Sequence, residues 1–211
     1  MTLSPQVIEN NRIEFINLIK SIEREGAQTE ALVEMLSNSD FFVAPASKNY
    51  HNSIEGGLCD HCLNVYRNLL KLVELHNLSF DSDTLKIVAL LHDISKMNMY
   101  KKSIKNEKVY CPNGSKYDQL GNFEWVSSEM YVSRDDIFVY GSHECTAEYI
   151  TRQYIPLTLE ESVAIIHHMG SMSWDSAKDN IGEVYNRYTL ALLLYMADMT
   201  ATYITENPRY E

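Results

Sequence analysis

Three apolar segments of this chain carry histidine or aspartate at positions where a buried helix normally holds only apolar residues. The run IVALL leads directly into His92 and Asp93, VAIIHHMG places His167 and His168 at the end of a second run, and LLLYMADMT places Asp198 inside a third. Burying an uncompensated carboxylate is costly. A metal ion removes that cost, because imidazole and carboxylate are ligands of first-row divalent metals. The pattern therefore predicts a buried metal site built from several helices.

The rest of the chain supports a mainly helical fold with one core. With 211 residues, 45% of them apolar and 22% charged, the chain is long enough to bury a core without disulfides or an obligate partner. We expect a single all-α domain over residues 1–211, with N-terminal helices in 1–40 and a metal-binding helical core in 41–96 and 141–205. Residues 97–140 contain β-prone pieces separated by turn signals, which predicts a small β-hairpin insertion.

Capping signals and apolar spacing locate the helices of this fold. Ser4 and Pro5 are typical of a helix start, and from Gly57 onward an apolar stripe at helical spacing includes His61. The capping box from Thr158 to Glu161 opens another helix. The expected helices are 5–26, 29–38, the segment from 57, the segment leading to His92, 142–153, 158–168 and one long helix over 185–205.

The charge balance limits the partners of the chain. Eighteen Lys and Arg against 29 Asp and Glu give a net charge of −11, which disfavours binding of duplex nucleic acid or an anionic membrane surface. Four cysteines are too few for a disulfide framework. The first residues lack the basic and apolar regions of a signal peptide, and the apolar runs are too short to span a membrane. A cytoplasmic protein is therefore expected.

The order and spacing of these motifs resemble a known family. GGLCDH matches a GGLxxH motif, LLHDISK matches HDxxK and LYMAD matches a terminal aspartate motif. From about residue 41 to residue 204 the chain thus resembles the HD superfamily of metal-dependent phosphohydrolases, an all-α helical bundle. PASKNYHNSIEGGL is similar to the segment before the HD core of 3′→5′ exoribonucleases that join an OB-fold to an HD domain. DFFxAPAS, IxxHMG and ADxxATY are similar to stretches of short standalone HD proteins of bacteria and prophages.

The resemblance implies a set of metal ligands. It assigns His61, His92, Asp93 and Asp198 to a first ion and makes Asp93 a bridge to a second ion held by His143 and His168. The IxxHMG match favours His168 over His167. Relatives more often read G-H-x-E where this chain has GSHE, a shift of about 100° on a helix, so the number of ions, one or two, stays open. Mn, Fe, Co, Ni or Zn suit these ligands, and Mg is possible.

The resemblance also implies the chemistry, which is hydrolysis of a phosphoester by metal-activated water. Asp93 would orient the water, and Lys96, one turn further on, would hold a phosphoryl oxygen, although its spacing alone fits a helix-end lysine equally well. His51 and Lys48 are candidates for leaving-group protonation and a second phosphate contact, unless their loop merely closes over the first helix. Trp174 would stack on a base or simply cap the core.

A run of lysines follows the HD motif, at Lys101, Lys102, Lys105 and Lys108. It predicts either a basic rim over a phosphate site or a solvated face.

Three functions remain open from the sequence, and the first of them is the one that it favours. The first is a phosphohydrolase acting on a small phosphorylated substrate, a nucleotide or a short oligonucleotide, either as a monomer or as a homo-oligomer. The second is an HD-type di-iron oxygenase, which would use the same ligands and the same lysine. The third is a non-catalytic nucleotide sensor or sponge, which the presence of every ligand type disfavours.

Overall fold

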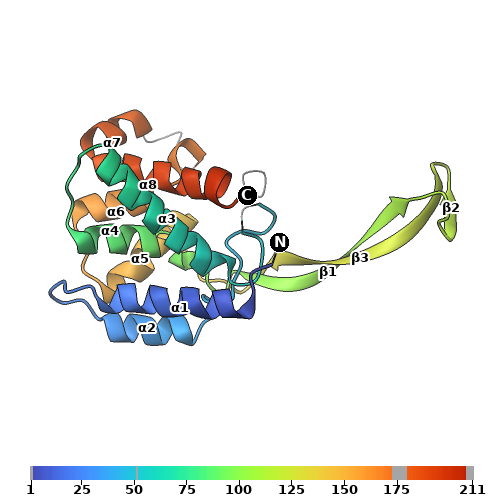
Figure 1. Ribbon diagram of the computed structural model, residues 1–211, viewed down its shortest axis with the longest axis horizontal. Helices are drawn as coiled ribbons and strands as arrows, with labels where there is room; N and C mark the ends of the chain where they lie inside the picture. The colour runs from blue at the N-terminus through green and yellow to red at the C-terminus, as the bar shows by residue number, and fades with distance from the viewer. Residues whose placement is uncertain (1, 51, 173–179, 208–211) are drawn as a thin grey trace.

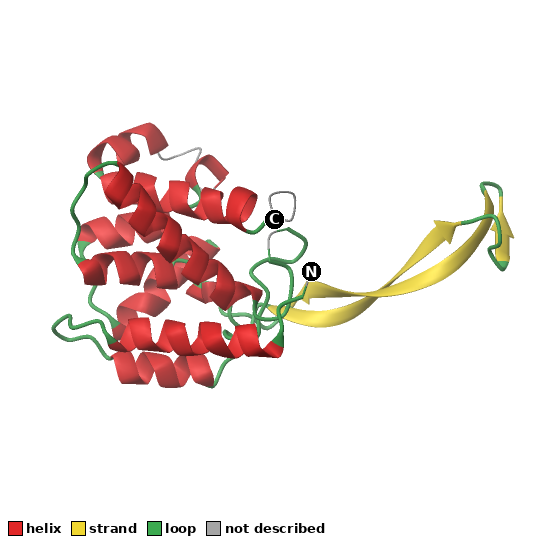
Figure 2. Cartoon of the chain, viewed as in Figure 1, coloured by secondary structure: helices red, strands yellow, loops and turns green. Residues whose placement is uncertain are grey.

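The computed structural model describes residues 2–50, 52–172 and 180–207. Its helices gather into one bundle, and a three-stranded sheet extends from the bundle as a long arm (Figures 1 and 2). None of the described helices combines the length and the apolar content needed to cross a membrane. The expected mainly helical bundle is confirmed, and the sheet lies where a β-hairpin insertion was expected.

The first two helices form a pair along one side of the bundle (Figure 1). α1 (Pro5–Lys20) begins as predicted, because the Ser4 side chain accepts a hydrogen bond from the backbone of Val7, and α2 (Thr29–Ser37) follows. The next loop buries Phe41 and Phe42 against Phe15 of α1, with ring centroids 4.9 to 5.8 Å apart. This aromatic cluster attaches the N-terminal pair to the loop that leads into the site.

α3 (Gly57–Leu75) begins at two glycines that cannot carry side chains. Gly56 has φ +78°, a left-handed conformation that favours glycine. A Cβ at Gly57 would lie 2.1 Å from the carbonyl oxygen of Asn52. The GGL sequence is therefore needed to bring the preceding loop against the first turn of α3, one turn before His61.

Gly57→Ala is expected to lower the free energy of unfolding by about 1 to 3 kcal/mol, because the added methyl group must displace backbone. Urea unfolding followed by circular dichroism would measure the change. The matched control is Gly182→Ala in α7 (Ile181–Arg187), where the nearest atom to a new Cβ is 3.5 Å away. That control should be neutral or slightly stabilising, because alanine has the higher helix propensity. Equal stability of Gly57→Ala and wild type would refute the packing argument.

The central helices end where the site begins. α4 (Ser82–Leu91) stops at Leu91, and a short 3₁₀ turn, Ile94–Lys96, follows. α5 (His143–Tyr154) starts at the candidate ligand His143. α6 (Leu159–Ile166) ends just before His167 and His168. Both hydrogen bonds of the predicted capping box of α6 are present: the Thr158 side chain accepts from the Glu161 N–H, and the Glu161 side chain accepts from the Thr158 N–H.

The expected single helix over 185–205 is wrong. The structure has α7 and then α8 (Thr189–Thr200), separated at Tyr188, whose φ of −124° and ψ of 85° break the helix. α8 continues into a π-helical turn, Ala201–Thr205. No Pro or Gly marks the break, so it was not visible as a sequence signal.

The predicted small β-hairpin is larger and contains a third strand. β1 (Tyr100–Tyr110) pairs antiparallel with β3 (Gly121–Ser133) in a register from Tyr100 opposite Ser133 to Tyr110 opposite Phe123. The short β2 (Lys116–Asp118) adds to the outer end of β3, giving the order β1-β3-β2. The long hairpin was underestimated because polar residues interrupt the alternation of apolar residues.

A buried carboxylate holds α6 in place. The Glu161 side chain is fully buried and accepts hydrogen bonds from Arg24 at 2.5 Å, Thr84 at 2.6 Å and the backbone of Thr158 at 2.8 Å. Burial disfavours the charged form of Glu161, but these three donors outweigh burial and hold the pKa of Glu161 below its usual value. The network ties α6 to α4 and to the segment after α1.

Candidate metal centre

Side chains from separate helices converge at the centre of the bundle. α3 supplies one, the ends of α4 and α6 and the start of α5 supply four, and α8 supplies one. They are His61, His92, Asp93, His143, His168 and Asp198. All are buried except His143, whose side chain is 27% exposed. The structure thus brings together the six residues that the sequence nominated as ligands.

Asp93 lies at the middle of this cluster. Its Oδ2 atom is 3.4 Å from His92 Nε2 and 3.6 Å from His61 Nε2. Its Oδ1 atom faces the other way, 3.6 Å from His168 Nε2 and 3.8 Å from His143 Nε2. The two oxygens of one carboxylate therefore face two different pairs of histidines.

The histidine rings are oriented by bonds on their outer nitrogens. The Nδ1 atom of His92 lies 2.9 Å from the carbonyl oxygen of Ala89, and that of His168 lies 2.7 Å from the carbonyl oxygen of Ile165. A carbonyl only accepts, so Nδ1 donates and Nε2 presents its lone pair to the cluster. Within the described part of the chain, Nε2 of His92, His143 and His168 has no hydrogen-bond partner.

A carboxylate that the sequence analysis missed orients His61. The side chain of Glu206 is buried, and its two oxygens lie 3.0 and 3.2 Å from His61 Nδ1. In a straight α-helix a residue eight positions after Asp198 would point about 80° away from it. The π turn, closed by the Glu206 N–H donating to the Ala201 carbonyl at 2.9 Å, inserts extra residues and turns Glu206 back toward His61. Only a deviation from α-helical geometry produces this contact.

A second acidic residue, Glu144, lies beside His143 without a hydrogen bond to its ring. Its buried carboxylate lies 3.3 Å from His143 Nδ1, while Ser142 caps the helix by accepting from the Cys145 N–H. His143 is therefore the first residue of α5. Its Nε2 atom lies 3.8 Å from Asp93 Oδ1, so His143 belongs to the cluster despite the one-residue shift of its motif.

The electrostatics of the cluster favour a cation. Burial disfavours the charged forms of both aspartates, but Lys96 holds the pKa of Asp93 well below its usual range, and the hydrogen bond to His61 lowers that of Asp198. Burial lowers the pKa of His143 to about 4, so at neutral pH its ring is a neutral, metal-competent imidazole. Burial also opposes charge on His61, yet Glu206 and Asp198 raise its pKa to about 10. The aspartates thus stay ionised and draw positive charge to the site.

The donor atoms fit a divalent metal ion. Atoms bound to one ion at about 2.1 Å lie about 3 to 3.5 Å apart, and the nitrogen-to-oxygen distances here run from 3.2 Å, between His61 Nε2 and Asp198 Oδ1, to 3.8 Å. Three groupings bring their ligand atoms within 4.8 Å of one another: His61, His92 and Asp93; His92, His168 and Asp198; Asp93, His143 and His168. A metal ion would give the buried Nε2 atoms of His92, His143 and His168 the partner that they lack among the described residues.

Comparison with protein families matches residues 58–192 to the HD domain. The match covers more than half of the chain and includes every clustered ligand except Asp198. The chain belongs to the HD domain family. HD domains bind divalent metals and are typically metal-dependent phosphohydrolases. Comparisons with curated proteins and with solved structures gave no match. The narrower likeness to OB-fold exoribonucleases and prophage HD proteins therefore remains a prediction.

The lysine of the HD motif lies against its aspartate. A 3₁₀ turn has three residues per turn, so Lys96 sits directly above Asp93, and Lys96 Nζ donates to Asp93 Oδ2 at 2.6 Å. Burial disfavours the ammonium, but Asp93 outweighs burial and raises the pKa of Lys96. The lysine is therefore charged, and it is part of the HD site rather than a solvated helix end.

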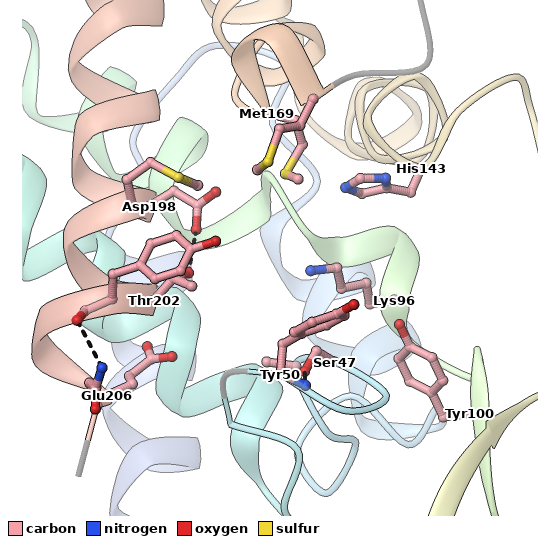
Figure 3. A pocket seen from close by; sticks show the side chains of 14 residues that line it. Ser47, Tyr50, Lys96, Tyr100, His143, Met169, Asp198, Thr202 and Glu206 are labelled. Carbon is pink, nitrogen blue, oxygen red and sulfur yellow. Dashed lines mark hydrogen bonds between the residues drawn. The ribbon is translucent and has the colours of Figure 1, made fainter. Parts of the chain in front are cut away.

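A cavity of about 860 Å³ opens over the HD cluster, a size suited to a small molecule. Figure 3 shows Lys96, His143 and Asp198 pointing into the same space. The apolar part of the lining is aromatic and methionine-rich: Tyr50, Tyr100, Met169, Met172, Met199 and Tyr203. The metal ligands and the Lys96 ammonium would thus face one end of a bound molecule. The tyrosine and methionine side chains would face the rest of it.

The other nominated residues lie elsewhere. Lys48 is exposed and does not line the cavity over the cluster. It lines a separate hollow, together with Glu55 and with Lys102 of β1. His51 and Trp174 fall outside the described residues, so their predicted roles remain predictions. The lysines after the HD motif run along the arm instead of forming a rim at the cavity (Figure 1).

Glu206→Ala is expected to weaken metal binding by about 10- to 100-fold, because a carboxylate that orients a ligand histidine contributes that much to affinity. Glu206→Gln keeps an acceptor oxygen for His61 Nδ1 and should recover much of the loss. Titration of each variant with Co²⁺, followed by visible absorbance, would give the dissociation constants. Equal constants for wild type and Glu206→Ala would show that the contact does not serve the metal site.

Proposed function

We propose that this HD protein is a metal-dependent phosphohydrolase that cleaves a phosphoester of a nucleotide or short oligonucleotide. The observation that carries the proposal is the position of Asp93, whose two oxygens face separate histidine pairs beneath a cavity that also holds an ammonium group. Such an arrangement suits one or two divalent ions, with Asp93 shared between them. The first ion would be held by His61, His92, Asp93 and Asp198, and the second by Asp93, His143 and His168.

When bound, divalent ions would neutralise the phosphoryl oxygens and acidify a water molecule. The protein's own part is to hold the reacting groups in place. Glu206 and two backbone carbonyls fix the histidine rings with Nε2 facing inward. Lys96 would bind a phosphoryl oxygen at the cavity floor and offset its negative charge. The tyrosines and methionines of the lining would contact the nucleoside part of the substrate.

Lys96→Gln is expected to lower kcat/KM by about 100-fold, because it removes a fixed positive charge from the phosphoryl site. Metal content, measured by elemental analysis, should remain close to that of wild type. The matched control is Lys86→Gln, since Lys86 also forms a mostly buried pair with an aspartate three residues earlier, Asp83, at 3.0 Å. A wild-type rate in Lys96→Gln would exclude a phosphate-binding role.

A phosphate-release panel tests the proposed reaction. The protein, loaded with Mn²⁺, is incubated with mononucleotides, nucleoside triphosphates, cyclic dinucleotides and short RNA, and products are separated by chromatography. Turnover of at least one class, lost in Asp198→Ala, supports the proposal. Oxygen uptake by iron-loaded protein without hydrolysis of any ester would identify an oxygenase instead. Tight binding of an intact nucleotide by calorimetry, with no product, would identify a sensor.

A further inference from the structure

The arm is much longer than its own fold requires. β1 and β3 pair over eleven residues each, which corresponds to about 35 Å of strand. Its far end, where β2 adds, lies well away from the helical bundle (Figure 1). A two-stranded ribbon in water is only marginally stable by itself, so an extended arm of this kind is expected to gain stability from a partner.

One face of the outer arm is aromatic. The pairing register places Tyr110, Phe123 and Trp125 together on one side of the sheet, beside Lys108. Ile104 lies on the same side nearer the bundle, and Asn106 and Ser127 lie between it and the aromatic residues. Ile104 is 70% exposed, Trp125 50% and Tyr110 44%. Exposed Trp and Tyr side chains on a fixed support are typical of the centre of a protein interface.

This face is held rigidly by its own contacts. Phe123 packs against Tyr110 and Trp125 with ring centroids 5.8 and 6.1 Å away. Lys108 lies 4.4 Å above the Phe123 ring and donates to Asp118 Oδ2 at 2.7 Å. An ordered aromatic surface loses little entropy on binding, which favours association.

The charges of the arm favour a protein partner over a polyanion. Lys102, Lys105 and Lys108 are already paired with Glu55, Glu107 and Asp118. Over residues 100–133 five lysines face four acidic residues, a charge of +1, which leaves −12 for the rest of the chain. The arm therefore carries no excess of negative charge, and like-charge repulsion does not oppose its docking on the acidic body of a second copy.

The body also carries a second exposed aromatic cluster. Phe138 and Tyr140, which precede α5, pack against Tyr149 of that helix with centroids 5.7 and 4.8 Å away. Their side chains are 58%, 57% and 37% exposed. This cluster lies on the bundle, whereas the aromatic face of the arm lies toward its far end, so the two surfaces do not meet within one chain (Figure 1).

We propose that the chain forms a reciprocal dimer in which the arm of each copy docks on the body of the other. The aromatic face around Trp125 would pack on the cluster formed by Phe138, Tyr140 and Tyr149. Two identical contacts related by a twofold axis close the assembly and leave no arm free. Each copy then contributes one arm and one acceptor surface, so the dimer buries twice the area of a single arm contact; stable interfaces bury roughly 800 Å² per partner.

Sedimentation velocity on the full-length protein from 1 to 100 μM tests this dimer. Wild type is expected to sediment at twice the monomer mass at the upper concentrations. Trp125→Glu and Tyr149→Glu should each raise the dimer dissociation constant at least tenfold, with unchanged helical circular dichroism. Ile104→Glu, at a more exposed position, is a second arm variant in case Trp125→Glu perturbs the strand. The control Leu75→Glu, which puts the same charge on a 71% exposed leucine at the end of α3, should dimerise as wild type does.

Two results would overturn the proposal. The first concerns the mass: the proposal fails if wild type is a monomer at 100 μM. It also fails if wild type dimerises and neither the arm variants nor Tyr149→Glu raise the dissociation constant. The other concerns nucleic acid: if Trp125→Glu leaves the mass unchanged but lowers the affinity for a fluorescent 20-nucleotide single-stranded RNA, the arm is a nucleic-acid surface.

Discussion

Asp93→Ala is expected to abolish metal uptake and to lower phosphoester hydrolysis by more than about a thousandfold. Asp93 is the one side chain whose oxygens face four histidines of the described cluster, so its removal takes a ligand from both of the ions that we propose for the site. Loss of several kcal/mol of transition-state stabilisation corresponds to a factor of this size. Elemental analysis and product release on the same sample would measure both effects.

The control for this variant is Asp136→Ala, which removes an aspartate with a 71% exposed side chain. It should bind metal and turn over substrate as wild type does. Circular dichroism should show both variants folded, because the helices are held by apolar packing around the cluster. Metal-loaded, active Asp93→Ala protein would exclude this cluster as the catalytic site.

Glu161→Ala is expected to lower the free energy of unfolding by about 3 kcal/mol, since it removes one partner of a mostly buried ion pair and leaves Arg24 uncompensated. For a chain of this length that corresponds to a fall in Tm of roughly 6 to 12 °C. The effect depends on pH. The pKa of Glu161 is depressed in the folded state, so its contribution is fully present above the unfolded pKa of about 4.3 and is lost as pH falls toward the folded pKa.

Thermal unfolding of Glu161→Ala and wild type at pH 7 and at pH 3.5 would check both parts of this prediction. The difference in Tm should be smaller at the lower pH. Glu160→Ala changes a carboxylate in the same helical turn and should cost less than about 1 kcal/mol. A full-sized effect in Glu160→Ala, or a difference in Tm that grows on acidification, would contradict the role given to Glu161.

The sequence predicted the parts of this molecule that depend on local pattern. Capping residues located the starts of α1 and α6, and apolar spacing placed His61 on the inner face of α3. Ionisable residues in apolar runs located the cluster, because burial of charge requires a compensating partner wherever the chain folds.

The parts that the sequence did not predict depend on deviations from regular geometry or on long-range packing. Glu206 reaches His61 only through a π turn. The break at Tyr188 has no Pro or Gly to announce it. The position of Lys48 is set by how its loop packs beside the arm, which no local pattern encodes.

The most direct test of the central claim is a crystal of the protein soaked in Mn²⁺, with an anomalous difference map calculated at a wavelength where manganese scatters. We expect a peak within about 2.3 Å of His92 Nε2 and an Asp93 oxygen, and a second peak between Asp93, His143 and His168 if two ions bind. A map without a peak among these residues, in protein that hydrolyses phosphoesters, would contradict the assignment of this cluster as the metal centre.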